Sequence, residues 1–162
     1  MKGAAVADDP TVLTLEGLAA EEAELRFERF DYDDAWRLGS MLVDAARAQQ
    51  LPIAIDITRG GQQLFHAALP GSTPDNDAWI QRKIRSVLRF GHSSMYISLQ
   101  RNLDGRSLAE VSFVDPREFA AAGGCFPIHV TGCGIIGTVT VSGLPQVEDH
   151  KLVVRVIRTF LS

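Results

Sequence analysis

The stretch from residue 123 to residue 150 constrains the fold of this chain more than any other. Two apolar runs rich in β-branched residues, 123–130 and 135–142, flank the short turn Thr131-Gly132-Cys133-Gly134. Glycine supplies the positive φ angles that tight hairpin turns require. We therefore expect an antiparallel pair of strands here, followed by a glycine corner at Gly143 and a closing helix from about Pro145 to Leu161 with a broad apolar face.

A second hairpin is predicted upstream. Residues 53–58 alternate between apolar and polar side chains, Arg59-Gly60-Gly61-Gln62 supplies a turn, and residues 63–68 form the return strand. With a two-residue turn, the expected cross-strand partners are Ile57 with Leu64 and Ile55 with His66 on one face, and Asp56 with Phe65 on the other.

Helical periodicity and capping residues predict the remaining elements. Thr73 caps a helix that begins at Pro74 and that Gly91 ends. Another helix runs from Asp31 or Asp33 to about Gln50. Gly39 inside it indicates a close neighbour, because glycine costs a helix about 1 kcal/mol relative to alanine. The other expected segments are a helix at 15–23, a short strand at 25–28 or a continuation of that helix, a helix from Ser93 or Ser94 to about 101, a turn at 102–106 and a short helix at 115–122.

The order of these elements predicts an α/β (α+β) fold. Hairpins favour an antiparallel sheet, and the helices before, between and after them cover both of its faces, which gives a three-layer α/β/α arrangement. A chain of 162 residues fits one domain. We expect a flexible tail at residues 1–13 and a single domain at residues 14–162, without an internal linker or repeat.

Composition narrows the class of protein. The net charge of −4 argues against a general nucleic-acid binder, which usually carries a basic excess. No apolar run is long enough to span a bilayer, and the N-terminus lacks the pattern of a secretion signal, so we expect a cytoplasmic protein without a membrane partner. Cys125 and Cys133 lie too far apart along an extended strand to form a disulfide, and we expect two free thiols.

Two long runs of the sequence resemble the UPF0303 family, a branch of the GlcG/HbpS-like group of haem-degrading domains. They are LPIAIDITRGGQQLFHAALPGSTPDNDAWIQRKIRSVLRFGHSS and FPIHVTGCGIIGTVTVSGLPQVEDHKLVV, and the specific motifs are GG-x-FPI, VSGLP and DH. The resemblance covers the chain from about Phe30 to its end. It implies a profilin-like fold with a five-stranded antiparallel sheet, and stable homo-oligomers. It implies no established activity, and the association with haem comes only from more distant relatives.

The residues that could carry chemistry are scattered along the sequence. The four histidines, His66, His92, His129 and His150, lack the HxH or HxxxH spacing of metal sites, so no metal site is predicted. A structural hydrogen bond is expected for His150 and a core position for His66, with a ligand role as the alternative. The glycine-rich turn at 132–134 leads into a strand and not into a helix, which argues against a phosphate loop. No GxSxG motif or other pairing of nucleophile and base is present.

The helix that begins at Pro74 carries a basic face. Arg82, Arg85 and Arg89 recur at helical spacing, with Lys83 beside them. Such a face suits a carboxylate or a haem propionate, and the alternative is a solvated face or salt bridges between subunits.

Three functional hypotheses remain. The first is a small-ligand-binding domain, with haem or a small carboxylate held between the sheet and the helix of residues 75–90. The second is an oligomeric scaffold or chaperone partner without catalysis, suggested by exposed sheet edges. The third is a haem-degrading enzyme, and haem as a cofactor rests on the resemblance alone. No catalytic residue is assigned, and the predicted ligand-binding residues are Asp56, His66, Lys83, Gly124, Phe126 and Pro127.

Overall fold

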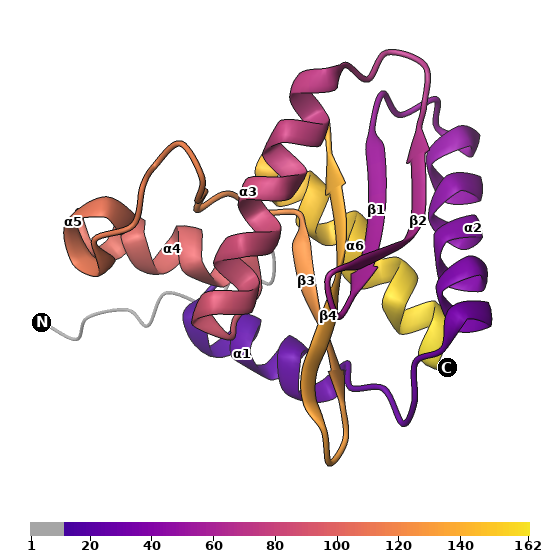
Figure 1. The fold of residues 1–162 in the computed structure, drawn as a ribbon, viewed down its shortest axis with the longest axis horizontal. Helices are drawn as coiled ribbons and strands as arrows, with labels where there is room; N and C mark the ends of the chain where they lie inside the picture. The colour runs from indigo at the N-terminus through magenta and orange to yellow at the C-terminus, as the bar shows by residue number, and fades with distance from the viewer. Residues whose placement is uncertain (1–11) are drawn as a thin grey trace, which may run out of the picture.

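The computed structural model describes residues 12–162, which form six helices and one four-stranded sheet (Figure 1). All but two residues of the predicted tail, 1–13, lie outside the described residues. The elements in chain order are α1 (Leu15–Glu24), α2 (Tyr32–Ala48), β1 (Ala54–Arg59), β2 (Gln62–Ala68), α3 (Pro74–Phe90), α4 (Ser94–Asp104), α5 (Leu108–Ser112), β3 (Cys125–Val130), β4 (Gly134–Ser142) and α6 (Gln146–Leu161).

The two predicted hairpins join into one antiparallel sheet with the strand order β2-β1-β4-β3. The expectation of a fifth strand at residues 25–28 is wrong for the described chain. Only Phe27 reaches the sheet there, through a single parallel bridge to Val130. The segment is short because α1 ends at Glu24 and α2 begins at Tyr32, so the chain crosses the end of β3 once and continues.

The first hairpin has the predicted turn but not the predicted register. Gly60 and Gly61 form the turn with φ angles of 56° and 81°. The register shifts between Ile57 and Thr58, so one extra residue of β2 is accommodated there. As a result, Ile57 pairs with Phe65, and Asp56 pairs with His66, which corrects all three predicted partners.

Most helix boundaries agree with the sequence-based expectations, with one exception. The predicted helix at 115–122 is wrong: residues 116–118 form a turn, and the chain then runs without regular structure to β3. The Asp115 carboxylate accepts the Arg117 backbone N–H at 2.8 Å, which favours a turn over a helix. The short helix in this region is α5, which lies earlier in the chain and is capped by Ser107.

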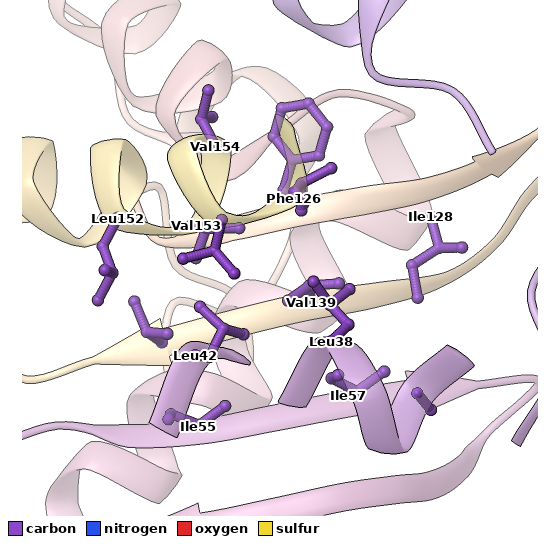
Figure 2. Packing of buried hydrophobic residues seen from close by; sticks show 14 of the residues in the cluster. Leu38, Leu42, Ile55, Ile57, Phe126, Ile128, Val139, Leu152, Val153 and Val154 are labelled. Atoms are coloured by element: carbon purple, nitrogen blue, oxygen red, sulfur yellow. The ribbon is translucent and has the colours of Figure 1, made fainter. Parts of the chain in front are cut away.

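The two faces of the sheet differ in character. Helices α2 and α6 cover one face, where Leu38, Leu42 and Val153 pack on the strands (Figure 2). Their partners on the sheet are the side chains of Ile55, Ile57, Phe126, Ile128, Val139 and Val141. Helix α3 covers the other face, so helices lie on both sides of the sheet (Figure 1).

None of the helices formed by residues 12–162 combines the length and the hydrophobicity that a bilayer-spanning segment needs.

Candidate functional site

The sheet face under α3 is polar at its centre. Ala54 and Cys125 contact the apolar side of α3, but the strand positions next to them carry Asp56, Thr138 and Thr140, all of which are buried. The Asp56 carboxylate accepts hydrogen bonds from Thr58 Oγ1 at 2.6 Å and from Gln63 Nε2 at 2.5 Å. Buried polar groups need such partners, so this face is held by hydrogen bonds as well as by packing.

A buried ion pair lies where α3 crosses this face. Lys83 Nζ is 3.4 Å from Asp149 Oδ2 and donates to the Val141 carbonyl oxygen at 3.2 Å. The side chains of Lys83 and Asp149 are only 3% and 2% exposed. Burial lowers the pKa of Lys83, although the neighbouring carboxylate opposes this shift. Burial also raises the pKa of Asp149 to about 6, because the Lys83 ammonium offsets the loss of hydration only in part.

Glycine backbone makes room for this pair. Gly124 has a φ angle of +123°, and a Cβ added to it would come within 2.9 Å of Lys83 Nζ. The second oxygen of Asp149 accepts the Leu144 backbone N–H at 3.0 Å, which ties the start of α6 to the end of β4. The motifs GG-x-FPI, VSGLP and DH, which all lie within residues 123–150, therefore meet around a lysine from a distant part of the chain.

A cleft of about 260 Å³ opens beside the ion pair, and we call it the lysine cleft. Its wall contains Lys83 together with the acidic residues Asp75 and Asp149. The remaining wall is made by Asn76, Trp79, Ala122, Ser142, Gly143, Leu144 and Gln146. The lysine cleft thus offers both hydrogen-bond donors and acceptors, with acids in excess.

A larger cleft of about 550 Å³ lies between α3, α4, α5 and the segment before β3, and we call it the arginine cleft. Arg82, Arg101 and Arg106 line it, and its wall contains no aspartate or glutamate. The aromatic rings of Trp79 and Phe119 add apolar surface. Trp79 and Ala122 belong to the walls of both clefts, so the two clefts adjoin.

Two of the three arginines are held in place, Arg82 by neutral groups and Arg101 by a carboxylate. The Arg82 guanidinium lies 4.5 Å from the centroid of the Trp79 ring, and its Nη2 donates to the Pro116 carbonyl oxygen at 2.9 Å. Arg101 pairs with Asp104 at 2.6 Å. Within residues 12–162, neither Arg82 nor Arg106 has a carboxylate within the 4 Å of an ion pair. The cleft therefore has a net positive charge.

The structure brings together only part of the predicted ligand-binding set. Lys83 lines the lysine cleft, and Gly124 lies beside its amine, behind the cleft wall. Asp56 is only 1% exposed and is closed off by Thr58 and Gln63. Phe126 belongs to the apolar core on the opposite sheet face, because neighbouring strand residues point to opposite faces (Figure 2). Pro127 is buried opposite Thr138 in the ladder.

His66 lies on the face opposite to the predicted one, outside the core. Its Nε2 is 2.8 Å from Asp77 Oδ1, so it links β2 to the first turn of α3. The predicted structural bond of His150 is confirmed: its ring is buried, and its Nε2 is 2.8 Å from Glu21 Oε2. His92 is 2.8 Å from Glu22 and stacks on Tyr96. Within residues 12–162, no three metal-ligating side chains converge.

Sequence reasoning identified Arg82 but missed Arg101 and Arg106. The expected turn at 102–106 placed Arg106 in a connection, where nothing in the sequence aims it at α3. The other two residues of the predicted basic face serve a different purpose. Arg85 donates to the Glu118 carbonyl oxygen at 3.2 Å, and Arg89 lies over the rings of Phe90 and Phe119. These contacts hold the segment before β3 against α3.

Both cysteines are free thiols, as expected. Burial raises the pKa of the Cys125 thiol to about 12, and its sulfur accepts a hydrogen bond from Thr140 Oγ1 at 3.0 Å. Only a thiolate is strongly nucleophilic, so Cys125 is inert in this position. Cys133 is exposed at the turn between β3 and β4.

Comparison with known proteins agrees with the fold and with the motifs. A family model described as haem degrading protein HbpS-like matches residues 30–158. UPF0303 proteins of Streptomyces avermitilis and Streptomyces coelicolor are 54% and 55% identical to this chain, over 96% and 94% of its length and 94% and 96% of theirs.

Solved structures show the same fold. The crystal structure of the Ybr137w protein is 37% identical, with a TM-score of 0.86 over 91% of this chain and 88% of its own. A complex of PduOC with haem shares the fold at 17% identity, with a TM-score of 0.68 over 80% of this chain and 93% of its own. The chain belongs to the UPF0303 family, within the HbpS-like group.

Proposed function

We propose that this protein binds a small organic anion, with the acidic group of the ligand in the arginine cleft. The observation that carries the proposal is a wall with three arginines and no carboxylate, beside exposed aromatic and aliphatic surface. The volume of about 550 Å³ lies within the usual range for small-molecule sites. Guanidinium groups bind carboxylates and phosphates through paired N–H donors, so an acid is the ligand chemistry that this wall favours.

The neighbouring lysine cleft suits an uncharged polar part of the same ligand. Its two aspartates would repel a second acidic group, whereas Lys83, Asn76 and Gln146 offer donors and acceptors. Of the residues predicted from the sequence, we retain Lys83 and Gly124 in the site, and we add Arg82, Arg101 and Arg106. The buried positions of Asp56, Phe126 and Pro127 support a role in shaping the fold around the clefts.

Haem is a weaker candidate for the ligand. The iron of protein-bound haem is held by histidine, cysteine, methionine or tyrosine. Among residues 12–162, none of these residue types lines the lysine cleft or the arginine cleft. The three arginines suit the propionates, but the walls do not fit the iron. The same mismatch gives no support to a haem-degrading activity for this chain.

Titration calorimetry tests the proposal directly. We expect glutarate, a small dicarboxylate, to bind the protein and to raise its melting temperature. Arg106→Gln removes an exposed cation without an ion-pair partner among residues 12–162 and should weaken binding by about tenfold or more, since one charge-assisted hydrogen bond contributes about 1.5–3 kcal/mol.

The matched control is Arg155→Gln, which removes an exposed arginine of α6 outside both clefts. Its affinity should stay within about twofold of the wild type. Equal losses in the two variants, or no binding of glutarate or of any other small acid tested, would count against the arginine cleft as the site.

Self-association is a second candidate property, favoured by the free edge of β2. In the described chain this strand pairs only with β1, and its neighbours Trp36 and Tyr32 are 68% and 60% exposed. Trp36 lies against Phe65, with ring centroids 5.8 Å apart, and the Tyr32 hydroxyl donates to Gln62. An open strand edge beside aromatic surface suits pairing with a second copy.

Light scattering on the intact protein tests this property. We expect a mass above that of one chain, and a shift towards the monomer in Trp36→Lys. A monomer at all concentrations up to about 100 μM would remove this candidate, since it would imply at most weak association.

A further inference from the structure

The amine of Lys83 has an unusual environment for a lysine. Its side chain is 3% exposed, and the residue is part of the wall of the lysine cleft. An ammonium group has three N–H donors. Among residues 12–162, Nζ has two acceptors, Val141 O at 3.2 Å and Asp149 Oδ2 at 3.4 Å, and both distances are long for charged hydrogen bonds. These two acceptors hold the amine in place, and the third N–H donor has no partner among the described residues.

The same pair provides a route for the lysine proton. Asp149 is the nearest carboxylate to Nζ, and burial raises its pKa while lowering the pKa of Lys83. Both shifts make the transfer of the proton from nitrogen to oxygen easier than in an exposed pair, and this transfer produces a neutral amine beside a carboxylic acid. A desolvated lysine of this kind is a nucleophile for carbonyl carbon.

No other nucleophile of comparable strength lies at this site. The Cys125 thiol, close enough to feel the charge of Lys83, stays protonated because burial raises its pKa to about 12. Ser142 and Asn76 are tied to each other across the cleft wall at 3.5 Å, and neither has a base to activate it there. The amine of Lys83 is therefore the reactive group of the lysine cleft.

We propose that Lys83 captures the carbonyl group of an oxo acid as an imine, with the acidic group of that ligand in the arginine cleft. The choice of an acid rests on the function proposed above, whereas the reaction of the amine does not. An oxo acid fits because its two groups match two adjoining clefts that share Trp79 and Ala122. Asp75 and Asp149 repel the anionic end of the ligand from the lysine cleft. The carbonyl end therefore lies beside Lys83.

The reaction balances with the groups present. The lone pair of Nζ forms a bond to the carbonyl carbon while protonated Asp149 gives its proton to the carbonyl oxygen. The nitrogen then returns one proton to Asp149, which protonates the new hydroxyl group, and this group leaves as water while the C=N bond forms. The product is a protonated imine that remains paired with the Asp149 carboxylate, so no external oxidant or reductant is needed.

Reductive trapping on the intact wild-type protein tests the proposal. The chain has only three lysines, Lys2, Lys83 and Lys151, which makes the site of reaction easy to assign. We would incubate the protein with 4-oxopentanoate, whose single carboxylate is separated from its carbonyl group by two methylene groups, reduce with borohydride and map the labelled peptides by mass spectrometry. We expect at least tenfold more label on Lys83 than on Lys151, although the side chain of Lys151 is 49% exposed and that of Lys83 is buried. A smaller preference, or no label on Lys83, overturns the proposal.

Glutarate separates this proposal from the proposed function, because it carries acid groups but no ketone that forms an imine. Glutarate binding without trapping of 4-oxopentanoate on Lys83 would agree with the anion site and overturn the imine. Trapping on Lys83 without glutarate binding would support the imine and count against the arginine cleft. In Lys83→Arg, which keeps the cation but removes the primary amine, the adduct should disappear. The peptide mapping on wild-type protein tests the imine at Lys83 even if this variant does not fold.

Discussion

Gly39 illustrates how a single missing side chain allows two layers to approach. It lies inside α2, where glycine is unfavourable, and the sequence therefore indicated a close neighbour. That neighbour is Phe65 of β2: a Cβ on Gly39 would overlap its ring. The backbone of α2 thus rests directly on an aromatic side chain that also contacts Trp36 of the same helix.

Replacing Gly39 by alanine should therefore destabilise the protein, even though alanine is the better helix former. The gain in helix propensity is about 1 kcal/mol, and the cost of overpacking is typically about 1–3 kcal/mol. Urea unfolding should show a net loss of about 1 kcal/mol or more. The double variant Gly39→Ala with Phe65→Leu should be more stable than the sum of its single changes predicts. Additive losses would mean that the contact with Phe65 is not the cause.

Asp149 gives a prediction about pH. Its pKa rises from an ordinary value of 3.8 to about 6 on folding, so the folded state binds this proton more tightly than the unfolded state does. The stabilising contribution of the bound proton is complete below pH 4 and is lost as the pH rises through about 6. A shift of two units corresponds to at most about 3 kcal/mol.

The variant Asp149→Asn isolates this contribution, because asparagine keeps an oxygen for the Leu144 N–H but does not titrate. The free energy of unfolding of the wild type, minus that of the variant, should fall between pH 4 and pH 7. The measurement is urea unfolding at several pH values in this range. Parallel profiles for the two proteins would contradict a raised pKa.

At the scale of elements, local sequence signals identified most of the structure. Thr73 and Pro74 begin α3, Gly91 ends it in a left-handed conformation, and Asp31 forms the capping box of α2. These signals act within a few residues of the element that they start or stop. The capping box of α5, Ser107 with Glu110, follows the same rule, although we did not predict this helix from the sequence.

The elements that sequence reasoning mispredicted depend on distant contacts. The shift between Ile57 and Thr58 is invisible in the alternation pattern of either strand, and it moved Asp56 opposite His66. Residues 115–122 have helical composition, but the Ala120 N–H donates to Ser86 Oγ and the Arg82 carbonyl oxygen, both in α3. Tertiary hydrogen bonds thus replace local ones there, and a local rule cannot anticipate them.

The β1–β2 turn offers a clean test of backbone preference. Gly61 has a φ angle of +81°, and no atom lies within 4 Å of a Cβ added to it. A substitution there acts only through the backbone, since it meets no neighbour. We expect Gly61→Asn to cost less than Gly61→Val by about 1 kcal/mol, because asparagine tolerates the left-handed region. Thermal unfolding compares the two variants, and equal melting temperatures would show that the turn does not constrain the hairpin.

At the scale of the whole molecule, the candidate site lies where several elements meet. Arg82 comes from α3, Arg101 from α4 and Arg106 from the connection to α5. Only the packing of α4 against α3 brings these arginines to one wall, so the sequence alone could not group them. Lys83 was identified because it lies next to Arg82 on one helix, although its buried partner Asp149 is 66 residues away.

This arrangement predicts where a bound anion would rigidify the protein. With saturating glutarate, amide hydrogen exchange should slow in residues 105–109 and 119–122, which line the arginine cleft. Exchange in the turn at 60–61, which lines neither cleft, should not change. Uniform slowing across the chain would indicate general stabilisation, and slowing confined to α2 would place the ligand elsewhere.

Helix α1 lies ahead of the segment that the family model matches, yet its glutamates reach three later parts of the chain. Glu22 accepts the Ser93 N–H at 2.7 Å and lies 2.8 Å from His92, Glu21 meets buried His150, and Glu24 pairs with Arg158. A shortened chain that began at residue 30 would lose every one of these acceptors at once. Neither ring nitrogen of His150 would then have a hydrogen-bond partner among the remaining residues, so boundaries drawn from sequence likeness alone would leave out a helix that ties these three parts of the molecule together.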